Sequence, residues 1–438
     1  MQHPCASFAY ADDCTAVAQS STPAGLLVQL RQFHDIVDEY QQCGLGDLNV
    51  KKTFTFGDES IKDQIRQGYN HSNDIRVVGV SVVTQNFDGT FAKLEKERLQ
   101  KWQTTINNVA KLPVSWSKRA HTLLTTQAQA TFGQGAHQMF TDVDELRKVR
   151  SSIMRCMWQT AYYSMSPSLT FALLLPVHLD PQFAMMYVGA LAFQRAAQKR
   201  PEILSRLFPA ITASEYEAVG PCTRMYELLE TPLGPIIQEL LDGAIHTQKQ
   251  LDKWKHDLRH AWRIHLYKQV AKDRPHQYAQ ADLVDPDRTM HYYKLLEIRA
   301  SDETLDPESV EQARMKLSVL RRLFAGGLLT ESRIRKHKRR PETITCPCGL
   351  GEEDTVEHIS WRCTKYQAVR AQMLNKLPQQ GRRLPVITQY AALILKNSQL
   401  TQDQIDCLQE TLVTIWQQHI RSFYAERSEE RRVGKECR

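Results

Sequence analysis

Hydrophobic residues follow two periods, one near the start of the chain and another over the rest. From Phe8 to Val17, small and β-forming residues alternate around an acidic centre, Asp12-Asp13. This pattern predicts a β-hairpin that presents two carboxylates at its tight turn. The apolar run from Ile75 to Val83 predicts another strand. After residue 90, apolar residues recur at helical spacing, and helices are predicted to dominate.

Two of the predicted helices follow the strands directly. One runs from Leu94 to Val109 and is broken by Pro113, and a second runs from about Ser117 to Phe140. Many helices are predicted from 141 to 330. Polar composition predicts a linker from Pro275 to Asp287, and a helical pair is expected from Pro307 to Ser332.

The segment 251–274 is the clearest of these helices. Its apolar stripe has four-residue spacing and consists of Trp254, Leu258, Trp262, Leu266 and Val270. Basic residues cover its other faces, so the tryptophans either belong to the core, which we favour, or form a base-stacking surface. His256 and His260 have the i, i+4 spacing of a metal-ligand pair, but no third ligand is apparent.

Composition places the chain among ordinary globular proteins. It has 438 residues, of which 42% are hydrophobic and 24% charged, which suits two or three domains. A net charge of +7 supports nucleic-acid binding only modestly. Prolines and charges interrupt the apolar stretches 169–177 and 183–193, so no membrane partner is expected. The ten cysteines lack the regular spacing of a disulfide scaffold.

Paired carboxylates at a fixed turn suggest a cation site, with Mg²⁺ the leading candidate. The string Phe8-Ala9-Tyr10-Ala11-Asp12-Asp13 resembles the palm motif of reverse transcriptases from non-LTR retrotransposons. The resemblance implies that Asp12 binds the catalytic Mg²⁺, that Asp13 supports it, and that Tyr10 belongs to the cofactor-binding residues. Without the resemblance, a plain surface turn is an equal alternative.

Two further segments resemble later motifs of the same family. Asn49-Val50-Lys51-Lys52-Thr53 follows a Gly-Leu start, and by position Lys52 would assist the leaving group. Val77-Val78-Gly79 resembles the core of the primer grip, where Gly79 would let the nucleic-acid backbone approach closely. The alternatives are a solvated lysine and an ordinary strand with a bulge.

A cysteine–histidine constellation lies near the C-terminus. Cys346, Cys348, His358 and Cys363 form the pattern C-x-C-x9-H-x4-C, and three thiolates with one imidazole suit tetrahedral Zn²⁺. The nearby acidic residues Glu352, Glu353 and Asp354 are interpreted as caps or surface charges. The stretch 354–363 also resembles the cysteine–histidine motif that follows the polymerase domain in many non-LTR retrotransposon proteins. The alternative is a cluster of reduced cysteines packed under a helix.

A basic arm precedes this constellation directly. Its six cationic residues are expected to contact nucleic-acid phosphates, although solvation or a localisation signal is the alternative. They are Arg333, Arg335, Lys336, Lys338, Arg339 and Arg340.

Together these features predict an α+β protein, with a small antiparallel palm sheet followed by helices. The expected regions are a partial palm (1–90), thumb-like helices (91–140), a helical connector (141–330), the basic arm with a zinc knuckle-like motif (331–370) and C-terminal helices (371–426). Residues 427–438 resemble the translation of a sequencing adapter and are therefore not assigned to any of these regions.

The resemblance implies a fragment of an RNA-directed DNA polymerase. Its partners would be an RNA template, a DNA primer or target, and deoxynucleoside triphosphates, and its location would be intracellular, at nuclear integration sites. The family's partner aspartate lies upstream of the Asp-Asp pair, so the chain alone is expected to be inactive. The alternatives are a non-catalytic nucleic-acid-binding module that uses the zinc motif and basic arm, and a pseudogene fragment.

Overall fold

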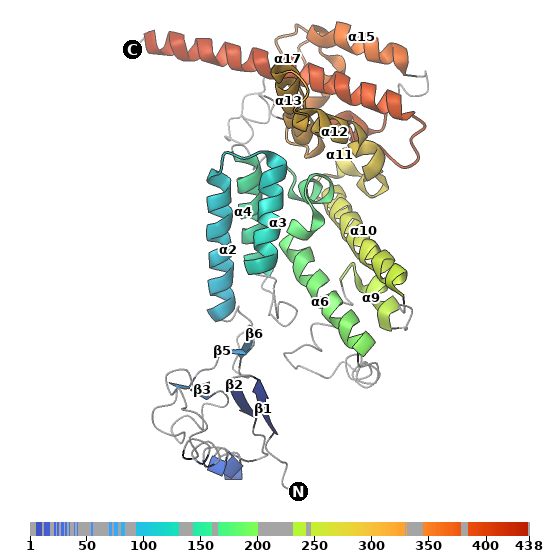
Figure 1. The fold of residues 1–438 in the computed structure, drawn as a ribbon. Helices are drawn as coiled ribbons and strands as arrows, with labels where there is room; N and C mark the ends of the chain where they lie inside the picture. The colour runs from blue at the N-terminus through green and yellow to red at the C-terminus, as the bar shows by residue number, and fades with distance from the viewer. Residues whose placement is uncertain are drawn as a thin grey trace.

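Helices make up most of the part of the chain that the structure describes (Figure 1). The computed structural model describes residues 93–130, 143–159, 165–199, 231–241, 247–328, 345–377 and 384–436, six short strands before residue 84, and isolated positions elsewhere. The longer helices are α2 (Lys93–Lys111), α3 (Trp116–Ala130), α4 (Val143–Trp158), α6 (Pro181–Lys199), α10 (Gln248–Asp273), α12 (Pro286–Ser301), α13 (Pro307–Phe324) and α17 (Gln402–Glu436). The shorter ones are α5 (Pro167–Leu169), η5 (Thr170–Leu174), η6 (Val177–Leu179), α9 (Gly234–Leu241), α11 (Pro275–Tyr278), η7 (Ala281–Leu283), η8 (His358–Arg362), η9 (Thr364–Tyr366), α15 (Gln367–Lys376) and α16 (Val386–Ala391).

The expected α+β fold with a palm sheet is wrong. The described strands form three separate pairs, and no sheet joins one pair to another within the described residues. The pairs are β1 (Ala6–Tyr10) with β2 (Asp13–Val17), β3 (Phe54–Thr55) with β4 (Asn70–His71), and β5 (Asp74–Val77) with β6 (Val80–Val83). A sheet stable by itself needs three or more strands with a shared hydrophobic face, which isolated pairs do not provide.

The segment 75–83 is not the single strand that its apolar run predicts. β5 and β6 pair antiparallel, with Val77 opposite Val80, so the chain reverses at this point. Two residues separate the paired valines, and the second of them is Gly79, a residue favoured in two-residue hairpin loops. The sequence does not predict this reversal, because the valines around Gly79 leave no polar turn residues there.

The first two helices after the strands match their predicted hydrophobic pattern. Leu99, Trp102, Ile106 and Val109 are all buried on one side of α2, which packs against α3 and α4. α2 ends at Lys111, two residues before Pro113, as the proline predicts. α3 ends at Ala130, and residues 131–142 of the longer predicted helix lie outside the described part.

The long helix α10 begins with a capping box. The Thr247 hydroxyl accepts from the Gln250 backbone N–H at 3.2 Å, and the Gln250 side chain accepts from the Thr247 N–H at 2.9 Å. All five residues of the predicted apolar stripe are buried. Trp254 Nε1 donates to the Ile236 carbonyl at 2.8 Å, and Trp262 Nε1 donates to Asp180 at 3.2 Å. The stripe is therefore core, because both indole N–H groups are satisfied inside the protein.

The expected linker 275–287 is instead a packed connection. It contains α11 and η7, and Tyr278, Ala281 and Val284 are buried. Val284 also forms a β-bridge with Leu395. The polar residues that suggested a linker lie between these buried positions. The expected helical pair after Pro307 is also different, because the described part holds one helix, α13, there.

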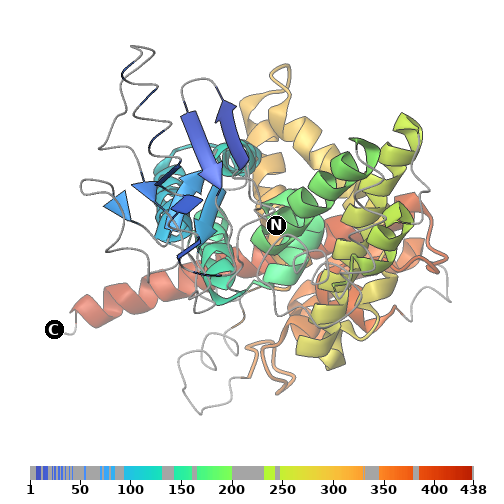
Figure 2. The ribbon, with the colours of Figure 1, turned by 90° about the horizontal axis from the view of Figure 1, so that it is seen from below.

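The C-terminal helices pack as one group. α12 and α13 pack side by side and both contact α17, which also contacts α15 (Figure 1). The two helices begin alike, because Asp285 and Asp306 each cap a helix with proline at its start. In both views the last part of α17 projects away from the other helices (Figure 2). Among the described helices, none has the length and apolar character needed to cross a bilayer.

One arginine joins this group to the α2–α4 bundle. The Arg321 guanidinium of α13 lies 5.1 Å from the ring centre of Trp116 in α3 and 5.5 Å from that of Tyr293 in α12. Its Nε donates to the Tyr293 hydroxyl at 2.9 Å. Ser117 of α3 donates to Glu297 of α12 at 3.1 Å. The contact between bundle and C-terminal helices thus combines ring stacking with hydrogen bonds.

Candidate metal centre

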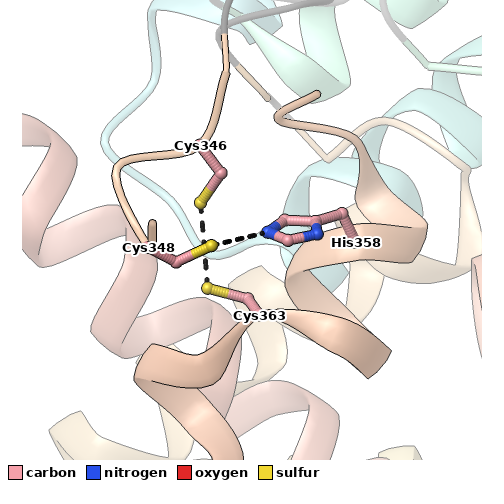
Figure 3. Close-up of side chains that lie close together, drawn as sticks. All are labelled: Cys346, Cys348, His358 and Cys363. Carbon is pink, nitrogen blue, oxygen red and sulfur yellow. Dashed lines mark hydrogen bonds between the residues drawn. The ribbon is translucent and has the colours of Figure 1, made fainter. Parts of the chain in front are cut away.

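The four residues predicted as metal ligands lie together in the structure (Figure 3). The ligand atoms of Cys346, Cys348, His358 and Cys363 all lie within 4.8 Å of one another. The Sγ atoms of Cys346 and Cys363 are 3.8 Å apart, and Cys348 Sγ lies 3.3 Å from Nε2 of His358. This group could hold a metal ion, which confirms that the constellation gathers at one site.

A tight turn brings the first two cysteines to the site. Thr345 and Glu353 form an antiparallel β-bridge, and the Cys346 N–H donates to the Glu352 carbonyl at 2.7 Å. Gly349 and Gly351 lie between the bridged residues with φ of 87° and 68°. Glycine adopts this left-handed region without steric cost, so the sequence permits a turn that points both thiols to one side.

A π-helical turn brings His358 and Cys363 together. In η8 the Cys363 N–H donates to the His358 carbonyl at 2.7 Å, which is the i to i+5 bond of a π-turn. In an α-helix, with 3.6 residues per turn, side chains five positions apart point to different faces. The wider turn brings both side chains to the cluster.

Burial and hydrogen bonding give the three thiols different pKa values. Burial raises the pKa of Cys346 to about 12 and also raises the pKa of Cys363. Burial acts upward on Cys348 too, but hydrogen bonds with the Leu350 backbone N–H and with the His358 ring outweigh it and lower the pKa of Cys348 to about 6. A cation is therefore needed before the two buried thiols become thiolates near neutral pH.

Two charged residues support the ligands from outside the cluster. Nδ1 of His358 lies 3.0 Å from a carboxylate oxygen of Glu352. The buried Arg370 of α15 donates to the carbonyls of Ile359, at 3.3 Å, and of Cys363. From the sequence, Glu352 is expected to be a cap or surface charge, and no feature of the sequence points to Arg370. The neighbouring sequence does not reveal the role of either residue, because each acts through a contact that forms only in the folded protein.

The structure ties the metal cluster to the helices behind it. Trp416 Nε1 of α17 donates to the Ser360 hydroxyl at 3.1 Å, and Trp361 Nε1 donates to the Gln389 carbonyl of α16 at 3.0 Å. Ser360 and Trp416 are fully buried. The turn that carries the ligands is therefore part of the C-terminal core.

Most other predicted site residues lie outside the described part. These are Asp12, Lys52, Gly79, Arg333, Arg335, Lys336, Lys338, Arg339 and Arg340. Tyr10 and Asp13 are described by their backbone, where they form the last pair of the β1–β2 hairpin. That register leaves Ala11 and Asp12 between the paired residues, which matches the predicted hairpin.

His256 and His260 do not form a second metal site with other described residues. Their rings stack at 6.3 Å between centres, and His256 lies 3.4 Å from Asp257. Within the part of the chain that the structure describes, Cys346, Cys348, His358 and Cys363 are the one group of His, Cys, Asp and Glu side chains close enough to share a metal ion.

The chain was also compared with known proteins. No protein-family model, no curated protein and no solved structure matches it. The resemblance to non-LTR retrotransposon proteins therefore stays a prediction that rests on the quoted motifs.

Proposed function

We propose that this protein holds a structural Zn²⁺ in its C-terminal region and serves in nucleic-acid handling. The observation that carries the proposal is the convergence of four buried or half-buried ligand atoms within 4.8 Å. Thiolate and imidazole ligands favour zinc over the hard cations Mg²⁺ and Ca²⁺.

The spacing of the sulfur atoms supports zinc. With Zn–S bonds of about 2.3 Å, two sulfurs on a tetrahedral zinc lie about 3.8 Å apart. Cys346 and Cys363 have this separation, 3.8 Å. Four protein ligands complete a tetrahedron and leave no open position for substrate. The site is thus structural, and its ties to α16 and α17 indicate what it stabilises.

Metal analysis of the purified protein tests this proposal. We expect one zinc per chain, lost in Cys363→Ser because the serine hydroxyl is a poor zinc ligand. Cys407→Ser is the matched control, since Cys407 lies in α17 outside the cluster. A zinc-free wild-type protein, or equal zinc in both variants, contradicts the proposal.

For the parent activity we propose RNA-directed DNA synthesis of the non-LTR retrotransposon type. Support comes from the motif around Asp12 and Asp13, from Lys52, and from the stretch 354–363, which resembles the family's cysteine–histidine motif. Asp12 and Asp13 would hold Mg²⁺, and Lys52 would neutralise charge on the leaving group. The template RNA, the DNA primer and deoxynucleoside triphosphates are then the partners.

Primer extension on an RNA template, by a protein that carries this chain together with an aspartate-bearing palm strand, tests that activity. We expect Asp12→Ala to abolish synthesis while zinc content stays unchanged. Asp35→Ala is the control, because Asp35 is an exposed acidic residue of the same region. Synthesis that survives Asp12→Ala rules out the assignment.

A second candidate is a non-catalytic nucleic-acid-binding module. It is favoured by the position of the basic arm directly before the metal cluster and by the absence of a palm sheet among the described strands. RNA affinity would then fall steeply with salt, with a slope that decreases by about 0.7 for each phosphate contact removed. Asp12→Ala would leave binding unchanged.

A charge-matched pair of variants tests this candidate. Neutralising three arm residues should weaken RNA binding and make the RNA affinity less dependent on salt concentration. Neutralising three exposed lysines of α10 should have a smaller effect on the affinity and on its salt dependence. The arm variant is Lys336→Gln, Lys338→Gln, Arg339→Gln, and the control is Lys253→Gln, Lys268→Gln, Lys272→Gln. Equal effects of the two variants contradict a specific role for the arm.

A further inference from the structure

Glu352 contacts the metal ligand His358 on the side away from the cluster. A carboxylate oxygen of Glu352 lies 3.0 Å from Nδ1 of His358, whose Nε2 is 3.3 Å from Cys348 Sγ. We propose that Glu352 is the positioning residue that orients His358 for metal binding. This inference rests on the proposed zinc site and deepens it.

The position of the proton on the imidazole ring decides which nitrogen can bind a metal. A neutral imidazole carries one N–H and one free lone pair, and only the lone pair binds a metal. A carboxylate that accepts from Nδ1–H keeps the proton there and leaves Nε2 free. In this structure, Nε2 is the nitrogen that faces the sulfur atoms (Figure 3).

Glu352 is itself held in place from two directions. Its carboxylate lies 3.1 Å from Nε of Arg362, and its backbone carbonyl accepts from the Cys346 N–H at 2.7 Å. One residue therefore connects two ligands, Cys346 through its main chain and His358 through its side chain. The turn that positions the first cysteine also aims the carboxylate at the histidine.

The positive charges around the site balance the negative charge that it would carry with a metal ion bound. Three thiolates with one divalent cation carry a net charge of minus one, and Glu352 adds a second negative charge. Arg362 pairs with that carboxylate, and the buried Arg370 donates to the Cys363 carbonyl. Two guanidinium groups thus balance the two negative charges in a partly buried region, where unpaired charge is costly.

Competition for zinc with a chromogenic chelator tests the proposal on the full chain. We expect Glu352→Ala to bind zinc about tenfold or more weakly than wild type, the lower end of effects reported for such outer contacts. Glu352→Gln retains an acceptor oxygen without the charge and should fall between the two. It also keeps the test valid if the alanine variant fails to fold.

Glu357→Ala is the matched control. Glu357 also pairs with Arg362, at 3.7 Å, and accepts from the Tyr390 hydroxyl at 2.8 Å, so it stabilises the same turn without contacting a ligand atom. The absorption spectrum of the Co²⁺-loaded protein gives a second readout. Glu352 variants should shift its visible bands because the histidine changes orientation, and Glu357→Ala should leave them in place.

The two proposals fail in different ways. Wild-type protein without zinc contradicts the zinc site itself. Wild-type protein with tight zinc, and Glu352→Ala no weaker than Glu357→Ala and with the same Co²⁺ spectrum, overturns the role of Glu352 alone.

Discussion

Arg370 is a buried cation whose partners are backbone carbonyls. Its side chain donates to the carbonyl of Ile359, near the start of the π-turn, and to that of Cys363, at its end. Arginine suits this place because its rigid fork reaches two acceptors at once, which lysine does not. Burial lowers the pKa of this guanidinium from its usual value, which reflects the cost of desolvating the charge.

We therefore expect Arg370→Ala to destabilise the zinc-loaded protein by about 2–4 kcal/mol, because two buried residues lose the charged donor to their carbonyls. Arg370→Lys should restore only part of the loss. Denaturant unfolding in excess zinc measures the effect. Arg314→Ala is the control, since that exposed arginine makes a surface ion pair with Glu311 worth less than about 1 kcal/mol. A loss at Arg370 no larger than this control contradicts the prediction.

His178 provides a residue-scale prediction about pH. Burial lowers its pKa to about 4, with a further contribution from Arg259 and Arg263. The unfolded chain binds a proton at this histidine near pH 6.5, whereas the folded chain does so only near pH 4, so stability falls as pH falls between these values. We expect His178→Phe to remove part of the loss in melting temperature between pH 7 and pH 5. An unchanged loss contradicts the assignment, and NMR titration of His178 checks the pKa directly.

At the scale of elements, α10 offers the clearest test of local sequence signals. Thr247→Ala removes the hydroxyl that caps the helix and should cost about 1 kcal/mol. Thr104 serves as control, because its hydroxyl bonds back to the Gln100 carbonyl within α2, and alanine there should be neutral or slightly stabilising. Thermal unfolding of the Thr247→Ala and Thr104→Ala variants measures the loss of stability in each. Equal losses would show that the cap contributes nothing specific.

Elements whose signals are local could be predicted from the sequence. The stripe of α10, the end of α2 before Pro113 and the β1–β2 hairpin follow from periodicity and turn chemistry within a few residues. The β5–β6 hairpin and the packed connection after Pro275 could not, because valines concealed one turn and polar residues surrounded the buried Tyr278. The expected palm sheet failed for a related reason, since strand pairing across long separations leaves no local trace.

In the metal centre, too, some residues could be predicted from the sequence and others could not. The cysteine and histidine types and their closeness in the sequence predicted all four ligands, because thiolate and imidazole are the ligands that zinc prefers. Glu352 and Arg370 act through contacts that only the folded chain creates, so nothing at their positions in the sequence distinguishes them from surface charges.

At the scale of the whole molecule, Arg321 is the clearest link between the α2–α4 bundle and the C-terminal helices. Its guanidinium stacks against Trp116 and Tyr293, which belong to different groups. Arg321→Ala should cost about 1–3 kcal/mol and separate the unfolding of the two groups into two calorimetric transitions. Arg322→Ala, at the neighbouring position of α13, is the control. A single transition in both variants contradicts a linking role.

The π-turn of η8 has a consequence for how this region can evolve. His358 and Cys363 face one another because the Cys363 N–H bonds to the His358 carbonyl five positions earlier in the chain. Gain or loss of one codon in this turn would rotate one ligand away from the cluster and abolish the proposed metal binding, even where every ligand is retained. Descendants of this gene should therefore tolerate changes of side chain between these two positions more readily than changes of length.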